Sequence, residues 1–262
     1  MNKESATTTP SSLLSGLRAL ITGGSQGIGR AIAESFGQAG ASIAIAALRD
    51  HFLDDAGEAL KCKTIGLDLS DPADTERAVK DAVTALGGLD ILVNNAAVVT
   101  PSAPVETTEA DELQLLLDVN LRGTFWAMRS AYPHLKQRRG CVLNVSSMAG
   151  VTGQARHAAY AMTKGGINAL TRSAAADWGS DGIRVNALCP IAAWTPALRQ
   201  WADEQPNPAE IASYLNRLPA LGYCPETNEI APVAVFLCSD AARFVTGHIM
   251  HVSGGAEVGY RL

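Results

Sequence analysis

The chain has 262 residues, of which 47% are hydrophobic and 18% are charged, so it is neither a disordered nor a fibrous protein. Its formal net charge is -5, which gives no basic surface for a nucleic acid or an anionic membrane, and we expect neither as a partner. The length suits a single α/β domain.

Residues 1–15 are rich in serine and threonine and lack the basic start and apolar block of a secretory signal, which predicts a flexible N-terminal tail. No later apolar run approaches the roughly 18 residues that span a bilayer. The five cysteines are odd in number and contain no Cys-x-x-Cys pair. Because most of them lie in apolar runs, we expect reduced thiols and a cytoplasmic protein.

Short aliphatic runs alternate with segments of helical periodicity along the rest of the chain. The predicted strands are 18–22, 42–46, 63–67, 91–94, 141–145, 183–188 and 248–252, and the predicted helices begin near Gly27, Asp54, Pro72, Glu109, Ala158 and Pro225. This alternation predicts one α/β domain over residues 16–262, with a doubly wound, Rossmann-type parallel sheet of seven strands and helices on both faces.

A glycine-rich segment, Thr22 to Arg30, follows the first strand and opens the first helix. Glycines allow a tight turn, and the free N–H groups and dipole of the helix N-terminus suit a pyrophosphate. A glycine-rich turn without a ligand is the alternative. The position in a βαβ unit favours dinucleotide binding, with six candidate residues: Gly23, Ser25, Gln26, Gly27, Ile28 and Gly29.

The pattern Tyr-x-x-x-Lys occurs twice, at Tyr132 and at Tyr160. Pro133 follows the first tyrosine and weakens helical geometry there, so we interpret Tyr132 as structural. Tyr160 lies downstream of a strand that ends at Ser146 and Ser147, and one helical turn places Lys164 on the same face. A strand can direct only one of the two serines toward this pair.

The one long irregular segment, about 190–224, contains five prolines and two tryptophans. A linker would be polar, whereas this segment mixes Trp, Leu and Ile, so we expect a substrate lid.

These motifs together resemble the short-chain dehydrogenase/reductase family. The resemblance covers nearly the whole chain after the tail and includes Thr-Gly-x-x-x-Gly-x-Gly, Asn94-Asn95-Ala96-Ala97, Tyr160-x-x-x-Lys164 and Gly254-Gly255. It implies four catalytic residues: Asn120, Ser147, Tyr160 and Lys164. Ser147, 13 positions before the tyrosine, is the family's serine and would polarise the substrate oxygen.

The resemblance also assigns roles within this set. Tyr160 would exchange a proton with the substrate, its pKa lowered by the Lys164 ammonium, which would also bind the nicotinamide ribose. Asn120 would hold a water that links the lysine to solvent. Asp68 would contact the adenine, Asn94 the adenosine ribose and Thr195 the carboxamide. Tyr160 and Lys164 are therefore expected to be cofactor contacts as well as catalytic residues.

The choice of cofactor depends on the residues beyond the second strand. Ala47 stands where relatives that use NAD commonly carry aspartate, and Arg49 is the nearest cation, whereas Gln26 replaces a basic residue common in relatives that use NADP. The sequence leaves both cofactors open and favours NADP(H) over NAD(H), with Arg49 as the phosphate contact. A solvated surface arginine is the alternative interpretation of Arg49.

Two further features affect the site and the assembly. Ile191 replaces the family's glycine after Pro190, which could reshape the nicotinamide site. His248 and His251 lie three apart on a predicted strand and face opposite sides, so we predict no metal site.

Residues 113–131 and 161–178 are apolar on more than one face, which predicts a homo-oligomer. The resemblance favours a tetramer, and a dimer is the alternative.

The sequence thus predicts an NAD(P)-dependent oxidoreductase that interconverts a secondary alcohol and a ketone by hydride transfer. The alternative is a dinucleotide-binding regulatory or scaffold protein without turnover, which would have no need of the serine and the tyrosine together. The identity of the small alcohol or ketone stays open.

Overall fold

The computed structural model describes residues 12–101 and 103–258. Most of the predicted tail, residues 1–11, lies outside this part. Within the tail, Leu14 is fully buried in the core and its N–H donates to the Ala39 carbonyl at 3.0 Å. The ordered domain therefore begins before Gly16, because Leu14 adds an apolar side chain to the core, and the predicted boundary at residue 15 is too late.

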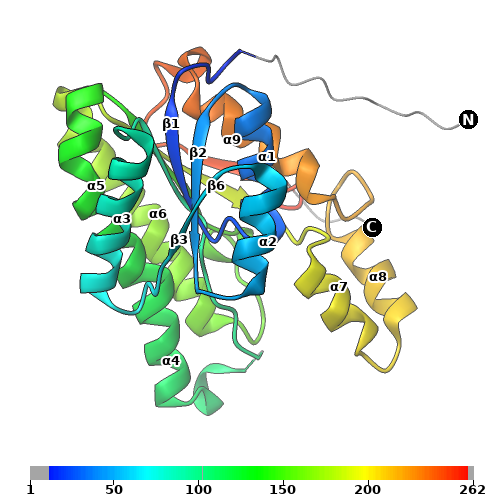
Figure 1. The fold of residues 1–262 in the computed structure, drawn as a ribbon. Coiled ribbons are helices and arrows are strands. Elements are labelled where there is room, and N and C mark those ends of the chain that lie inside the picture. The colour runs from blue at the N-terminus through cyan, green and yellow to red at the C-terminus, as the bar shows by residue number, and fades with distance from the viewer. Residues whose placement is uncertain (1–11, 102, 259–262) are drawn as a thin grey trace, which may run out of the picture.

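The sheet of the described residues has seven parallel strands in the order β3-β2-β1-β4-β5-β6-β7, which confirms the predicted fold class (Figure 1). The strands are β1 (Arg18–Thr22), β2 (Ser42–Ala47), β3 (Lys63–Gly66), β4 (Ile91–Asn94), β5 (Cys141–Val145), β6 (Arg184–Pro190) and β7 (Ile249–Val252). The strand order reverses direction between β1 and β4. In doubly wound sheets, ligands bind at the carboxyl ends of the strands beside such a point.

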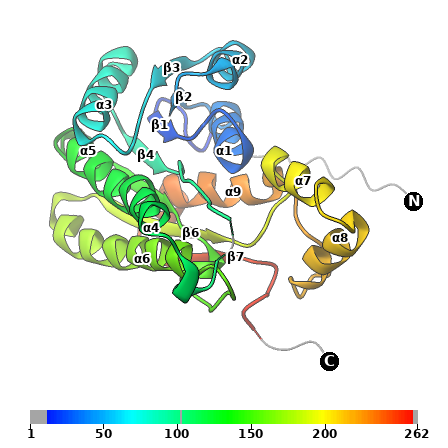
Figure 2. The same cartoon turned by 90° about the horizontal axis from the view of Figure 1, so that it is seen from below.

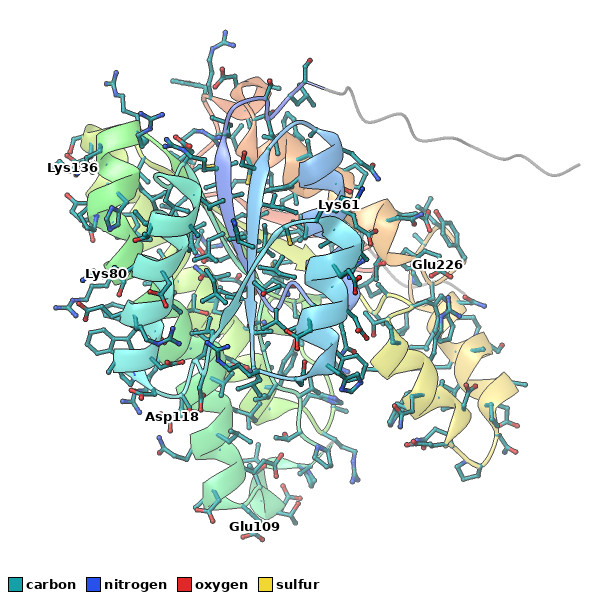
Figure 3. The ribbon with its side chains drawn as sticks, viewed as in Figure 1. Lys61, Lys80, Glu109, Asp118, Lys136 and Glu226 are labelled. Carbon is teal, nitrogen blue, oxygen red and sulfur yellow. The ribbon has the colours of Figure 1, made fainter. Side chains whose placement is uncertain are left out.

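Helices cover both faces of the sheet (Figure 2). On one face lie α1 (Gly27–Gln38), α2 (His51–Leu60) and α9 (Thr227–Cys238), and on the other lie α3 (Pro72–Leu86), α5 (Thr124–Arg138) and α6 (Ala158–Trp178). A hydrophobic core lies on each face of the sheet. Because side chains alternate along a strand, Ala19 and Ile21 pack in one core and Leu20 packs in the other. Charged side chains lie around the outside of the ribbon (Figure 3).

The helix that leads into α5 is not regular. The short helix α4 (Ala110–Leu116) continues into a π-helical turn, Leu117–Gly123, which joins α5 directly. Such turns often occur at functional sites. This one contains the candidate residue Asn120.

The predicted lid segment contains two helices, α7 (Pro196–Asp203) and α8 (Pro208–Arg217), which stand apart from the sheet (Figures 1 and 2). The prolines explain the difference from an irregular segment, because each of these helices begins on one, and proline suits the first helical position. Upstream of α7, the N–H of Ile191 donates to the Val252 carbonyl at 3.2 Å. In the described part of the chain, no helix combines the length and the apolar character needed to cross a membrane.

Candidate active site

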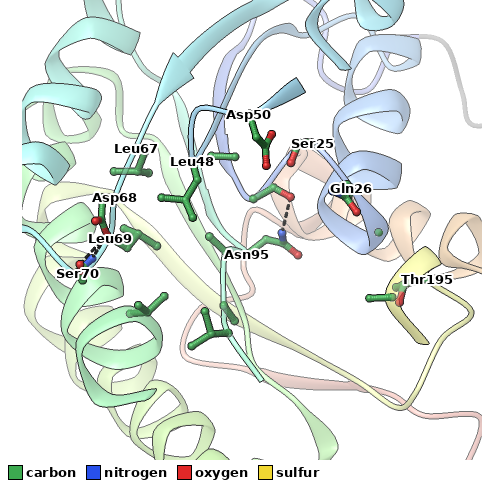
Figure 4. Close-up of a pocket in the computed structure, with 18 of the residues that line it drawn as sticks. Ser25, Gln26, Leu48, Asp50, Leu67, Asp68, Leu69, Ser70, Asn95 and Thr195 are labelled. Atoms are coloured by element: carbon green, nitrogen blue, oxygen red, sulfur yellow. Dashed lines mark hydrogen bonds between the residues drawn. The ribbon is translucent and has the colours of Figure 1, made fainter. Parts of the chain in front are cut away.

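A cavity of about 570 Å³ lies at the carboxyl ends of the strands, beside the point where the strand order reverses (Figure 4). The loops after β1, β2, β3 and β4 and the start of α7 form its walls. Of the predicted cofactor residues, those that line it are Gly23, Ser25, Gln26, Gly27, Asp68 and Thr195. The position and size of the cavity suit a nucleotide.

The glycine-rich loop is shaped for close approach by a ligand. Gly23 has a φ of +64°, and a Cβ there would lie 2.8 Å from the Ala96 Cα, so only glycine fits without strain. The Gln26 side chain makes no capping hydrogen bond and the first turn of α1 holds no acidic residue. The N–H groups of that turn therefore suit a diphosphate, and the residues present fit a dinucleotide.

Asn95, to which the sequence alone assigns no role, lies in the cavity wall. Its Nδ2 donates to the Thr22 carbonyl oxygen at 3.0 Å and to the Gly23 carbonyl oxygen at 3.1 Å, the second of which is drawn in Figure 4. Its main-chain N–H donates to the Thr22 hydroxyl at 3.0 Å. Asn95 lines the cavity and fixes the loops after β1 and β4 against each other.

Asn94, the predicted ribose contact, does not line the cavity. It is buried in the sheet, where its Nδ2 donates to Asn144 Oδ1 at 2.8 Å, while its own Oδ1 has no hydrogen-bond partner. Ile28 and Gly29 also lie outside the lining: Ile28 packs against the core, and a Cβ on Gly29 would lie 2.2 Å from Asn95 Nδ2. Only the main chain of these two residues is suited to a phosphate.

Arg49, the predicted phosphate contact, is not among the lining residues either. Its side chain covers Gly66, where a Cβ would lie 2.4 Å from Arg49 Nε. The charged side chains that line the cavity are Asp50 and Asp68. Asp50 Oδ1 also accepts from the Leu53 N–H at 3.0 Å and so caps α2.

Ser147 and Tyr160 lie together where β5 and the first turn of α6 meet. The Ser147 hydroxyl accepts from the Ala149 N–H at 3.1 Å, and the Ser147 side chain is near enough to the Tyr160 phenol to affect its pKa. Burial raises the pKa of Tyr160 to about 12, and the Ser147 side chain acts in the opposite direction. The phenol is therefore neutral at physiological pH.

Lys164 lies one turn after Tyr160 and is 2% exposed. Its Nζ donates to the Val145 carbonyl at 2.9 Å and lies 5.6 Å from the centroid of the Tyr160 ring. Burial lowers the pKa of Lys164 to about 8. The pKa of Tyr160 in this structure is raised and not lowered as the resemblance implies, because burial dominates the phenol.

Asn120 is fully buried in the π-helical turn. Its Oδ1 accepts from the Val98 N–H at 2.8 Å, and its Nδ2 donates to the Val98 carbonyl at 2.9 Å. A longer bond of 3.4 Å joins Nδ2 to the Thr163 hydroxyl, next to Lys164. The side chain thus links a cavity-lining loop to α6.

The second Tyr-x-x-x-Lys pair lies elsewhere. Tyr132 donates to Asp181 Oδ2 at 2.6 Å, and Lys136 Nζ donates to the Tyr132 hydroxyl at 3.3 Å. Pro133 lies inside α5, so the expectation that it weakens the helical geometry at this pair is wrong. Neither member of this pair lines the cavity.

In the described residues, His, Cys, Asp and Glu side chains form no group of three or more that could hold a metal ion. His251 instead lies 3.3 Å from Glu257.

Comparison with known proteins finds one matching family profile and several related dehydrogenases. Residues 23–257 match the family profile described as enoyl-(acyl carrier protein) reductase. The chain is 38% identical to 2,5-dichloro-2,5-cyclohexadiene-1,4-diol dehydrogenase of Sphingobium indicum, over 92% of this chain and 97% of that protein. It is 36% identical to L-fucose dehydrogenase of Mus musculus, over 94% of this chain and 90% of that protein.

Among solved structures, levodione reductase superposes with a TM-score of 0.90 at 30% identity, covering 94% of this chain and all of that one. Both named relatives are dehydrogenases that act on CH–OH groups. With a profile that matches most of its length and relatives of this similarity, the chain belongs to the short-chain dehydrogenase/reductase family.

Proposed function

We propose that this protein interconverts a secondary alcohol and a ketone with a nicotinamide cofactor, and that Tyr160 donates and accepts the proton. The observation that carries the proposal is the closeness of the Ser147 side chain to the Tyr160 phenol, with the buried amine of Lys164 one helical turn further on. A protein that only binds a dinucleotide has no need of this arrangement.

The bound nicotinamide supplies or accepts the hydride. The Ser147 hydroxyl donates to the substrate oxygen and polarises its bond to carbon. A neutral Tyr160, with its raised pKa, gives its proton to the alkoxide that forms during reduction. In the oxidative direction Tyr160 must receive a proton, and the Lys164 charge beside its ring then favours the phenolate that starts the step.

Asp50 and Asp68 support NAD(H) as the cofactor, against the preference that the sequence suggests. A 2′-phosphate in this cavity would face two carboxylates, and no lysine or arginine lines the described cavity. A free ribose hydroxyl can donate to a carboxylate, whereas a phosphate would be repelled by it. We therefore infer that NAD(H) binds more tightly than NADP(H).

The substrate that we infer is a small molecule with more than one hydroxyl group. This follows from the names of the two relatives, one for a cyclic diol and one for a sugar.

We also infer that the protein forms a homo-oligomer and acts in the cytoplasm. The exposed side chains of Leu115, Phe125 and Met162 support contacts with further copies of this chain, and the free thiols of the described cysteines suit the cytoplasm.

The test is a panel of diols and sugars with NAD⁺ and NADP⁺, read at the absorbance of the reduced nicotinamide. Tyr160→Phe should lower turnover by about 100-fold or more while the cofactor dissociation constant stays close to that of the wild type. A Tyr160→Phe variant with full turnover would remove the tyrosine from its role. A wild-type protein that binds cofactor but oxidises no member of the panel would favour the scaffold alternative.

A further inference from the structure

A buried thiol lies behind the Ser147–Tyr160 pair and has no part in the chemistry above. Cys189 precedes the last residue of β6 and is fully buried. Its Sγ donates to Asn168 Oδ1 at 3.7 Å. Burial raises the pKa of the thiol, while Ser146 and the main chain of Ser147 beside it act in the opposite direction. The sulfur therefore touches the loop that carries the candidate serine.

Asn168 connects the same thiol to the helix that carries the candidate tyrosine. It lies one turn beyond Lys164 on α6 and is 5% exposed. Its Nδ2 donates to the Gly150 carbonyl at 3.0 Å, at the end of the short 3-10 turn that Ser147 caps. Asn168 thus holds α6 to the loop after β5, while Cys189 holds both to β6.

Ser146 completes the connection from the strand side. Its hydroxyl donates to the Lys164 carbonyl at 3.0 Å, and its N–H donates to the Leu188 carbonyl at 2.8 Å. The loop after β5 is therefore bonded to α6 on one side and to β6 on the other. Cys189 on β6 and Asn168 on α6 add a side-chain contact between these two elements.

We propose that Cys189 and Asn168 form a positioning pair that sets the separation between the Ser147 hydroxyl and the Tyr160 phenol, an inference that rests on the proposed function. Neither residue touches the reacting atoms. An apolar side chain at position 189 would leave the buried Asn168 oxygen without its donor. Small displacements of reacting groups lower catalytic rates steeply, so the loss should appear in kcat.

The experiment compares three variants of the full chain. Cys189→Ala should lower kcat about three- to tenfold, with the KM for the cofactor within about twofold of the wild type, because other loops form the cofactor cavity. Cys189→Ser keeps a donor and an acceptor and should restore most of kcat. Cys141→Ala is the matched control. It removes a buried thiol at the start of β5, whereas the Ser147 loop follows the end of that strand, and it should leave kcat unchanged.

A double variant tests whether the two residues act together. Asn168→Ala should lower kcat by at least a similar factor, since it also removes the bond to the Gly150 carbonyl. Adding Cys189→Ala to it should have little further effect, because the contact between the two residues is already broken. Thermal midpoints of all variants separate a loss of folding from a loss of positioning.

Three results would overturn the pair: a wild-type kcat for Cys189→Ala, equal losses in Cys189→Ala and Cys141→Ala, or no recovery in Cys189→Ser. Failure of the proposed function is distinguishable, since it would appear as full turnover in Tyr160→Phe. An inactive Tyr160→Phe beside a normal Cys189→Ala would overturn the positioning pair alone.

Discussion

The amine of Lys164 donates to the main-chain carbonyl of Val145 at 2.9 Å, inside the protein. This bond holds the amine beneath the Tyr160 ring, 5.6 Å from its centroid. Burial lowers the pKa of Lys164 to about 8, so the side chain is mostly charged at neutral pH and loses its charge in mildly alkaline solution. The position of the amine therefore has consequences for both stability and activity.

The first prediction concerns the pH dependence of stability. The folded protein releases the Lys164 proton near pH 8, whereas the unfolded chain keeps it until its ordinary pKa of 10.5. Between these values the unfolded state binds more protons, so this lysine makes the free energy of unfolding rise with pH, by at most about 1.4 kcal/mol per pH unit. Lys164→Met should lose this rise.

Urea unfolding of both proteins between pH 7 and pH 9.5 measures the effect, below the range where the unfolded tyrosines titrate. If the two proteins show the same slope of unfolding free energy against pH, the lowered pKa of Lys164 is wrong.

The second prediction separates the two Tyr-x-x-x-Lys pairs. Tyr132→Phe removes the hydrogen bond to Asp181, which is also paired with Lys136 at 2.9 Å. We expect a loss of unfolding free energy of about 1 kcal/mol, measured by urea titration, and a kcat equal to that of the wild type. It is the matched control for Tyr160→Phe, since both changes remove one phenolic oxygen. Reduced turnover in Tyr132→Phe would contradict its structural assignment.

The third prediction concerns the cofactor. Leu48 lines the cavity and is 62% exposed, so arginine can replace it without disturbing the core. Leu48→Arg should improve kcat/KM for NADP⁺ relative to NAD⁺ by about tenfold, because it adds a cation to a cavity lined by carboxylates.

Two control variants accompany it. Asp50→Asn should raise the KM for NAD⁺ while the helix cap on α2 stays intact, since asparagine caps as well as aspartate. Arg49→Ala should leave the KM for NADP⁺ unchanged. A large increase of that KM in Arg49→Ala would restore Arg49 as the phosphate contact.

The fourth prediction concerns Asn95. Asn95→Ala removes the two bonds to the carbonyl oxygens of Thr22 and Gly23 and loosens the glycine-rich loop. The dissociation constant of the cofactor, measured by quenching of protein fluorescence, should rise about tenfold. Since Ser147 and Tyr160 lie on other elements, kcat at saturating cofactor should change little. An unchanged dissociation constant would show that the loop needs no such support.

Local patterns determined the framework of this protein. The aliphatic runs predicted seven strands within about two residues of their observed ends, because the central strands β1, β4, β5 and β6 are mostly buried on both faces and need apolar side chains. The glycine-rich loop was predictable for a related reason, since backbone turns and the start of α1 depend on near neighbours in sequence. The lid helices were harder to predict from the sequence. Their prolines suggested an irregular segment, whereas each of the two helices begins on a proline.

The tertiary structure decided which side chain of each motif faces the cavity. Asn95 lines it and Asn94 does not, and Asp50 lines it while Arg49 covers Gly66. Neighbouring residues differ in this way because the direction of a side chain at a strand end is set by the packing of elements distant in sequence. The same holds for Lys164 on α6: sequence spacing put its amine near Tyr160, but only the carbonyl of Val145, at the end of β5, fixed where the charge lies.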